Sequence, residues 1–150
     1  MFWVIATAVL AFMLAPILWI IPSPRQRRQV QLRERARELG VAVQIMVLPQ
    51  NRRQRVRREA EQNGLAYSMN LPKSRAGERW RWWLDGAEDD VPAPPLERER
   101  QLAALRDRLP TDAIVVEAGE RRIRIFWREA NADVAAVDNL AAILAELVAE

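Results

Sequence analysis

Arginine is the side chain with the clearest capacity for binding chemistry in this sequence. Five of the seven residues in the stretch RRQRVRR are arginines, namely Arg52, Arg53, Arg55, Arg57 and Arg58. Guanidinium groups attract phosphate oxygens, but a basic run by itself has no base specificity. The stretch is therefore a candidate site for an anionic surface, either lipid headgroups or a nucleic acid, with nucleic acid the less favoured of the two. A solvated basic helix or loop is the alternative interpretation.

Groups suited to catalysis are scarce. The chain has neither Cys nor His, which excludes Cys nucleophiles, His-based triads and Cys- or His-ligated structural zinc. Lys73 and Ser74 are adjacent in a predicted loop, which is poor geometry for a base and its nucleophile. The acidic stretch from Glu88 to Asp90 lacks the regular ligand spacing of a cation site. We therefore predict a protein that is not an enzyme, with no catalytic, cofactor-binding or metal-binding residues.

The N-terminal segment is apolar. No charged side chain occurs from Phe2 to Ile21, and about 20 helical residues would match a hydrocarbon layer of about 30 Å. We predict that residues 2–22 form a transmembrane helix. A cleaved signal peptide, which should have a basic start and a shorter core, and a buried helix of a soluble protein are the alternatives. The candidate membrane-interface residues are Trp3, Trp19, Arg25, Arg27 and Arg28.

The basic residues near this segment predict an orientation. They follow it and do not precede it, so the positive-inside rule places the N-terminus outside and the C-terminal domain in the cytoplasm. The absence of Cys suits a reducing compartment. The predicted location is the bacterial inner (plasma) membrane, with a single pass and the lipid bilayer as one partner.

Residues 23–40 predict a basic juxtamembrane helix, with Ser23 as N-cap, Pro24 at the first helical position and Gly40 at the end. An apolar anchor followed by Pro24-Arg25-Gln26-Arg27-Arg28 resembles the YajC-type accessory subunit of the bacterial preprotein translocase, over about residues 2 to 39. The resemblance implies a comparable topology and an accessory role beside a membrane complex. The Arg-heavy, Lys-poor composition also resembles that of small inner-membrane proteins of high-GC proteobacteria.

Residues 41–150 predict a small cytoplasmic α+β domain. With the preceding helix, the expected order is α-β-β-β-α-β-β-α, with antiparallel hairpins packed by helices. The predicted strands are residues 41–48, 65–71, 79–84, 113–118 and 121–128, and the predicted helices are 96–109 and 132–149, the second capped by Asn131. A hairpin is expected between the second and third strands.

A second hairpin is expected around Gly119-Glu120, as a type II′ turn. This register places Glu117 opposite Arg122, Val116 opposite Ile123, and Ile114 opposite Ile125, so charged and apolar pairs fall on separate faces.

Two surfaces are candidate partner contacts. Trp80 and Trp82 alternate on one face of their strand as core residues, so Trp83 on the other face is free to contact a partner. The last helix has a broad apolar face that packs on the sheet by default, or else docks a partner through Leu140, Leu144 and Leu147.

The predicted function is that of a non-enzymatic single-pass inner-membrane protein. Its cytoplasmic domain acts as a protein-interaction or accessory module of a membrane complex, for example in secretion or the envelope. The expected partner is a membrane protein or a second copy of the chain. The alternative is a membrane-tethered module that binds nucleic acid or anionic lipid through residues 52–58.

Overall fold

The computed structural model describes residues 1–19, 23–130 and 132–149, and side chains only outside 16–22. The chain divides into two compact units, Met1–Gln31 and Leu32–Glu150. The first contains helix α1 (Phe2–Trp19), and helix α2 (Pro24–Glu38) runs through the division. The second unit therefore begins inside α2, nine residues before the expected start of the domain at residue 41.

The predicted transmembrane helix is wrong. Helix α1 covers Phe2–Trp19, 18 residues without a charged side chain. Within the described ranges, the structure has no helix with both the length and the apolar character needed to cross a bilayer. The expected span continued through residues 20–22, which lie outside the described part of the chain. The predicted inner-membrane location and its single-pass orientation depended on this span and are wrong with it.

Helix α2 begins and ends as the sequence predicts. The backbone N–H of Gln26 donates to Ser23 Oγ at 3.3 Å, and the Ser23 N–H donates to Gln26 Oε1 at 2.9 Å, so the two residues form a capping box. Gly40 ends the helix with φ of 77°, a left-handed conformation that favours glycine. In the second unit, Leu32 and Ala36 of this helix are buried in the core.

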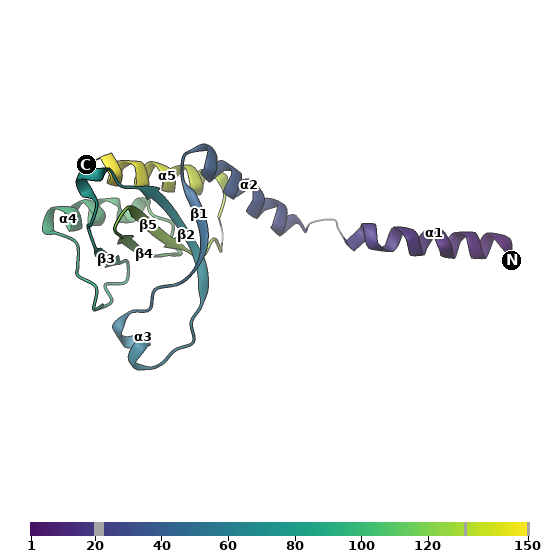
Figure 1. The fold of residues 1–150 in the computed structure, drawn as a ribbon, viewed down its shortest axis with the longest axis horizontal. Helices are drawn as coiled ribbons and strands as arrows, with labels where there is room; N and C mark the ends of the chain where they lie inside the picture. The colour runs from purple at the N-terminus through teal and green to yellow at the C-terminus, as the bar shows by residue number, and fades with distance from the viewer. Residues whose placement is uncertain (20–22, 131, 150) are drawn as a thin grey trace. The chain divides into compact units, whose positions relative to one another are not determined.

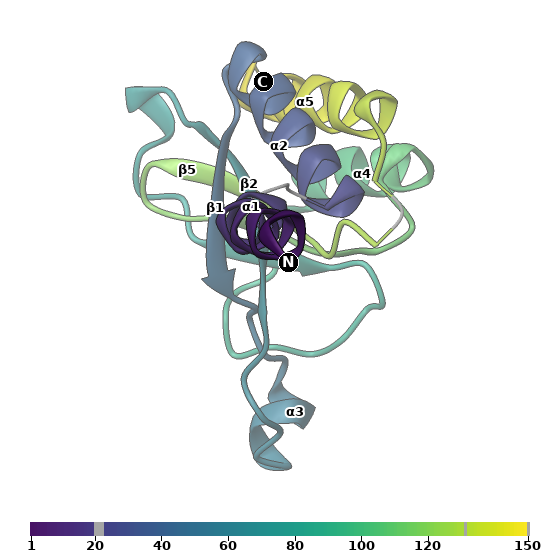
Figure 2. The same ribbon diagram turned by 90° about the vertical axis from the view of Figure 1, so that its right-hand side faces the viewer.

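The second unit is built on one antiparallel sheet of five strands, in the order β1-β2-β5-β4-β3 (Figure 1). The strands are β1 (Ala42–Val47), β2 (Asn63–Asn70), β3 (Trp80–Trp83), β4 (Ala113–Ala118) and β5 (Arg122–Trp127). The helices are α3 (Arg52–Val56), α4 (Leu96–Leu105) and α5 (Val134–Ala149). Figure 2 shows α4 and α5 together on one side of the sheet and α3 at the far tip of the β1–β2 connection. The α+β class agrees with the sequence. Among the described residues, the expected order gains helix α3 and two short 3-10 helices, Lys73–Arg75 and Arg106–Arg108.

The expected hairpin between the second and third strands is wrong. Strand β2 pairs with β1 and β5, whereas β3 pairs with β4 at the other edge of the sheet. Strand β5 lies at the centre of the sheet, and four of its six side chains are buried. The segment after β2 crosses the β4–β5 turn instead, where Leu71 N–H donates to the Arg121 carbonyl at 2.8 Å.

The β4–β5 hairpin forms, but its predicted register is wrong by two residues. Glu117 pairs with Arg124 and Ala118 with Ile123. The Gly119 N–H donates to the Arg122 carbonyl at 2.8 Å, so the turn residues are 120 and 121, and neither they nor Gly119 has the positive φ of a type II′ turn. A shift of two residues leaves every side chain on the same face, so the alternating pattern fits both registers.

The core has two parts, one on each face of the sheet. Helix α5 packs on one face, where its buried residues Val137, Leu140, Ile143, Leu144 and Leu147 meet Tyr67, Ile123, Ile125 and Trp127. On the other face, Leu48, Ala66, Trp83, Val115 and Phe126 form a smaller cluster. Trp83, Leu140, Leu144 and Leu147 are therefore core residues and are not available as the surface contacts predicted for them.

The start of α5 differs from the expected one. The Ala136 N–H donates to Asp133 Oδ1 at 2.7 Å, so Asp133 caps this helix. The predicted cap, Asn131, lies outside the described residues.

Candidate functional site

The arginine-rich stretch forms the short helix α3 and the turn after it. Asn51 and Gln54 cap the helix reciprocally, with bonds of 2.9 and 3.0 Å. The Arg52 N–H donates to the Glu88 carbonyl at 3.0 Å. Helix α3 therefore lies against the acidic loop that follows β3.

That loop neutralises part of the arginine charge. Arg55 Nη2 lies 2.8 Å from Asp89 Oδ1 and 2.9 Å from Asp90 Oδ2. Arg53, Arg57 and Arg58 are exposed. A phosphate approaching this tip would meet carboxylates as well as guanidinium groups, which weakens the attraction that the sequence suggests.

Asp89 joins α3 to the sheet. Its side chain is only 3% exposed, and its Oδ2 accepts from Arg81 Nη1 at 2.6 Å and from Trp83 Nε1 at 3.0 Å. Burial acts to raise the pKa of Asp89, but the hydrogen bonds from Arg81 and Trp83 outweigh it and hold the pKa below its ordinary value. The oxygens of Asp89 therefore stabilise the fold through ion pairs.

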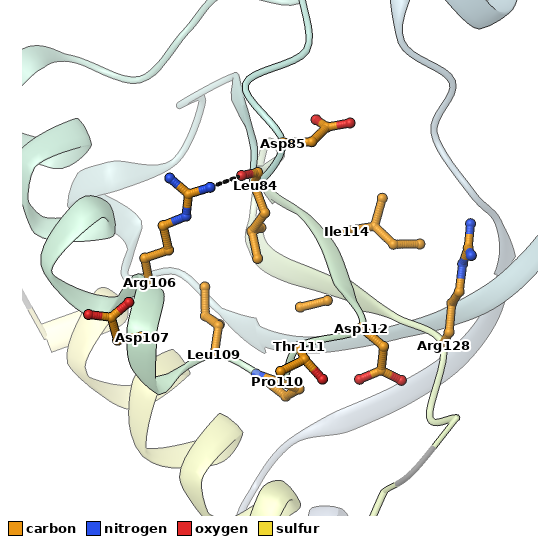
Figure 3. Close-up of a pocket in the computed structure, with 11 residues that line it drawn as sticks. Leu84, Asp85, Arg106, Asp107, Leu109, Pro110, Thr111, Asp112, Ile114 and Arg128 are labelled. Atoms are coloured by element: carbon orange, nitrogen blue, oxygen red, sulfur yellow. Dashed lines mark hydrogen bonds between the residues drawn. The ribbon is translucent and has the colours of Figure 1, made fainter.

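An open cleft of about 870 Å³ lies beside the start of β4 (Figure 3). Figure 3 shows Leu84, Leu109 and Ile114 between Arg106 on one side and Arg128 on the other. Arg106 Nη2 donates to the Leu84 carbonyl at 2.6 Å. Asp112 accepts from Trp127 Nε1 and, at 2.7 Å, from the Ala130 N–H. Arg106 and Asp112 thus hold the backbone around the cleft.

Tyr67 and Glu129 form a polar contact at the edge of the core. Tyr67 is fully buried, and its hydroxyl donates to Glu129 Oε1. Burial raises the pKa of Tyr67 and the Glu129 carboxylate raises it further, so the phenol stays protonated. Glu129 itself has a positive φ of 53°, an uncommon conformation for a residue other than glycine.

The Tyr67 hydroxyl should contribute measurably to stability. Tyr67→Phe leaves the Glu129 carboxylate without its donor and is expected to lower the free energy of unfolding by about 1–3 kcal/mol. Urea unfolding followed by circular dichroism measures the change. Ser68→Ala is the control, because Ser68 Oγ makes only a 3.3 Å bond to the Ala42 carbonyl and should lose less. Equal losses in the two variants would show that the Tyr67–Glu129 bond contributes nothing.

The large apolar side chains of α1 from Phe2 to Leu14 are exposed. Phe2, Trp3, Phe12 and Met13 retain 78, 81, 84 and 67% of their accessible surface. Arg25, Arg27 and Arg28, which follow α1 in sequence, are also exposed. The side chain of Trp19 lies outside the described residues. Of the residues predicted for a membrane interface, Trp3 thus lies exposed on an apolar helix, and Arg25, Arg27 and Arg28 are exposed on α2.

A second group of arginines was not singled out from the sequence. Arg79, Arg81, Arg121, Arg122 and Arg124 line one hollow, although they come from two separate segments of the chain. The signal in the sequence is arginine at alternate positions, 79 and 81 in the first stretch and 122 and 124 in the second. This pattern predicts only the solvent-facing side of a strand.

Comparison with known proteins gives no relative: no protein family, curated protein or solved structure matches this chain. The fold defines the class, an α+β protein with one antiparallel sheet. The resemblance of residues 2–39 to YajC-type subunits stays a prediction.

Proposed function

We propose that this chain is a non-enzymatic protein-interaction module and that α1 is its docking element. The observation that supports the proposal is the exposure of the large apolar side chains of α1. Contiguous apolar surface of this kind is typical of an interaction site, because each large apolar side chain gains about 1.5–3 kcal/mol when it is fully buried.

The chemistry of α1 suggests what the partner offers. The helix has apolar residues all round and no charged side chain, so it fits an apolar groove in another protein. The arginines Arg25, Arg27 and Arg28 follow within nine residues of the end of α1. A groove with acidic residues near the exit of the helix would therefore complement both parts of the segment.

The lack of catalytic groups supports a role without enzymatic activity. The chain has no His or Cys, and of its described serines Ser68 is buried while Ser23 and Ser74 are exposed. Asp89 and Asp112 accept hydrogen bonds that hold the fold. These residues do not form a nucleophile with an adjacent base.

The alternative function, binding of a nucleic acid or anionic lipid through residues 52–58, has weaker support. Arg55 is paired with Asp89 and Asp90, so the tip offers less positive charge than its five arginines suggest.

The proposed docking is tested by isolating the partner of the full chain from the source cells and titrating it, once purified, against three forms of the chain. We expect Phe12→Asp to weaken binding by about thirtyfold or more, because it places a charge in the apolar contact. Isothermal titration calorimetry measures the dissociation constants.

Val56→Asp is the matched control. Val56 is also exposed, at 77%, but it lies on α3, so binding should match that of the unmodified chain. Equal binding of all three forms, or equal weakening in both variants, would contradict the assignment of α1 as docking element.

A further inference from the structure

We propose that the hollow lined by Arg79, Arg81, Arg121, Arg122 and Arg124 binds the phosphate group of a small phosphorylated molecule. The site lies on the face of the sheet opposite α5 and includes no residue of α1 or α3. Its volume is about 540 Å³, within the usual range for small-ligand sites.

The register of the strands assembles the hollow from two rows of residues. In the first row, Arg81 pairs with Glu117 and Glu117 with Arg124, across β3, β4 and β5. In the second row, Gly119 and Arg122 are joined by the 2.8 Å turn bond. Alternate residues of a strand share a face, so both rows lie on the side of the sheet that carries Trp83.

Gly119 keeps the space between the rows open. A Cβ at this position would lie 3.0 Å from Arg124 Nη1, so the absence of a side chain allows the Arg124 guanidinium to lie over the turn. Arg124 Nη1 also donates to Glu117 Oε1 at 3.0 Å, which fixes the guanidinium at the floor of the hollow.

The hollow has an excess of positive charge. Five arginines and two glutamates, Glu117 and Glu120, line it. Glu117 is shared between Arg81 and Arg124, and Glu120 pairs with Arg79. Arg122 Nε donates to the neutral amide of Asn70 at 3.1 Å. Within the described part of the chain, neither Arg121 nor Arg122 has a carboxylate partner.

This arrangement favours phosphate over a single carboxylate. Terminal phosphate oxygens can accept from several guanidinium groups at once, and the planar fork of arginine matches their geometry. A phosphate dianion can replace solvent at Arg121 and Arg122, which lie at the turn. The ion pairs of Arg81 and Arg124 with Glu117, at the floor of the hollow, stay in place. The same chemistry serves free phosphate and a phosphate ester.

The test is calorimetric titration of the full chain with inorganic phosphate, adenosine 5′-monophosphate and malonate, all at one ionic strength. We expect saturable binding of both phosphates and binding of malonate at least tenfold weaker. Tighter binding of the nucleotide than of phosphate would identify an ester as the ligand, and equal binding would identify free phosphate.

Two double variants locate the site. Arg121→Gln with Arg122→Gln should weaken phosphate binding at least tenfold, and it removes no carboxylate pair, so an unchanged melting temperature is expected. Arg57→Gln with Arg58→Gln removes the same charge from the exposed turn after α3 and should leave binding within twofold. The absence of saturable binding, equal affinity for malonate, or equal losses in the two variants would overturn the proposal.

Discussion

Leu144→Asp is expected to unfold the domain formed by residues 32–150. Leu144 has no accessible surface and lies in the core between α5 and the sheet. Truncation of such a leucine to alanine costs about 2–5 kcal/mol, and a carboxylate at the same position must also be desolvated without a partner. Because small domains have about 5–15 kcal/mol of stability in total, far-ultraviolet circular dichroism and urea unfolding should show a chain with little or no cooperative transition.

Ala142→Asp is the matched control for this result. Ala142 is exposed on the same helix, so the substitution should cost less than about 1 kcal/mol, mainly through helix propensity. Equal small losses in both variants would show that α5 is not packed on the sheet, and the apolar face of α5 would again be available for a partner.

Asp89→Ala is expected to have the second-largest effect, a loss of about 3 kcal/mol in the free energy of unfolding. The substitution removes the acceptor of Trp83 Nε1 and one carboxylate partner each of Arg81 and Arg55. The Arg81 side chain is only 15% exposed, so its charge loses a partner where water cannot replace it. Asp90→Ala is the control, because Asp90 pairs with the same Arg55 but is 67% exposed and should cost less than about 1 kcal/mol. Equal losses would contradict a structural role for the Asp89 ion pairs.

The Asp89 contribution should depend on pH in a defined direction. The folded-state pKa of Asp89 lies below its ordinary value, which is about 3.9 in an unfolded chain. The stability that Asp89 contributes is therefore fully present above that value and is lost as the pH falls through the folded-state pKa. The stability difference between the unmodified chain and Asp89→Ala should be constant from pH 7 to pH 5 and shrink below pH 4. A difference that grows on acidification would have the wrong sign.

Local signals in the sequence predicted local structure well. Ser23 and Gly40 mark the two ends of α2 through a side-chain cap and a left-handed residue, and both effects act over a few residues. The five strands also lie where alternation and β-branched residues predict them. The order of the elements could therefore be predicted from the sequence.

Strand pairing depends on the whole chain and was predicted less well. The loop after β2 contains Pro72 and Gly77, which favour a hairpin locally, yet β2 pairs with β1 and β5 and not with β3. Trp83 was assigned to a surface because one face of a strand usually meets solvent. Here the loops around β1 and β3 cover a second cluster, in which Trp83 packs with Leu48 and Phe126.

The two groups of arginines differ in how far apart their members lie along the sequence. Residues 52–58 are adjacent in sequence, so the stretch was recognised, but its neutralisation by Asp89 and Asp90 requires a contact across more than thirty positions. Arg81 and Arg124 stand apart in sequence, and only the pairing of β3, β4 and β5 brings them to one hollow. Clusters assembled by a sheet cannot be read from spacing along the chain.

Docking of α1 in an apolar groove of another protein can be detected by site-specific photo-cross-linking in the source cells. A photoreactive phenylalanine analogue replaces Phe12 in one form of the full chain and Val56 in another, and both positions are exposed, at 84 and 77%. We expect one dominant protein adduct from position 12 that is absent from position 56. No adduct from position 12, or the same adducts from both positions, would contradict it.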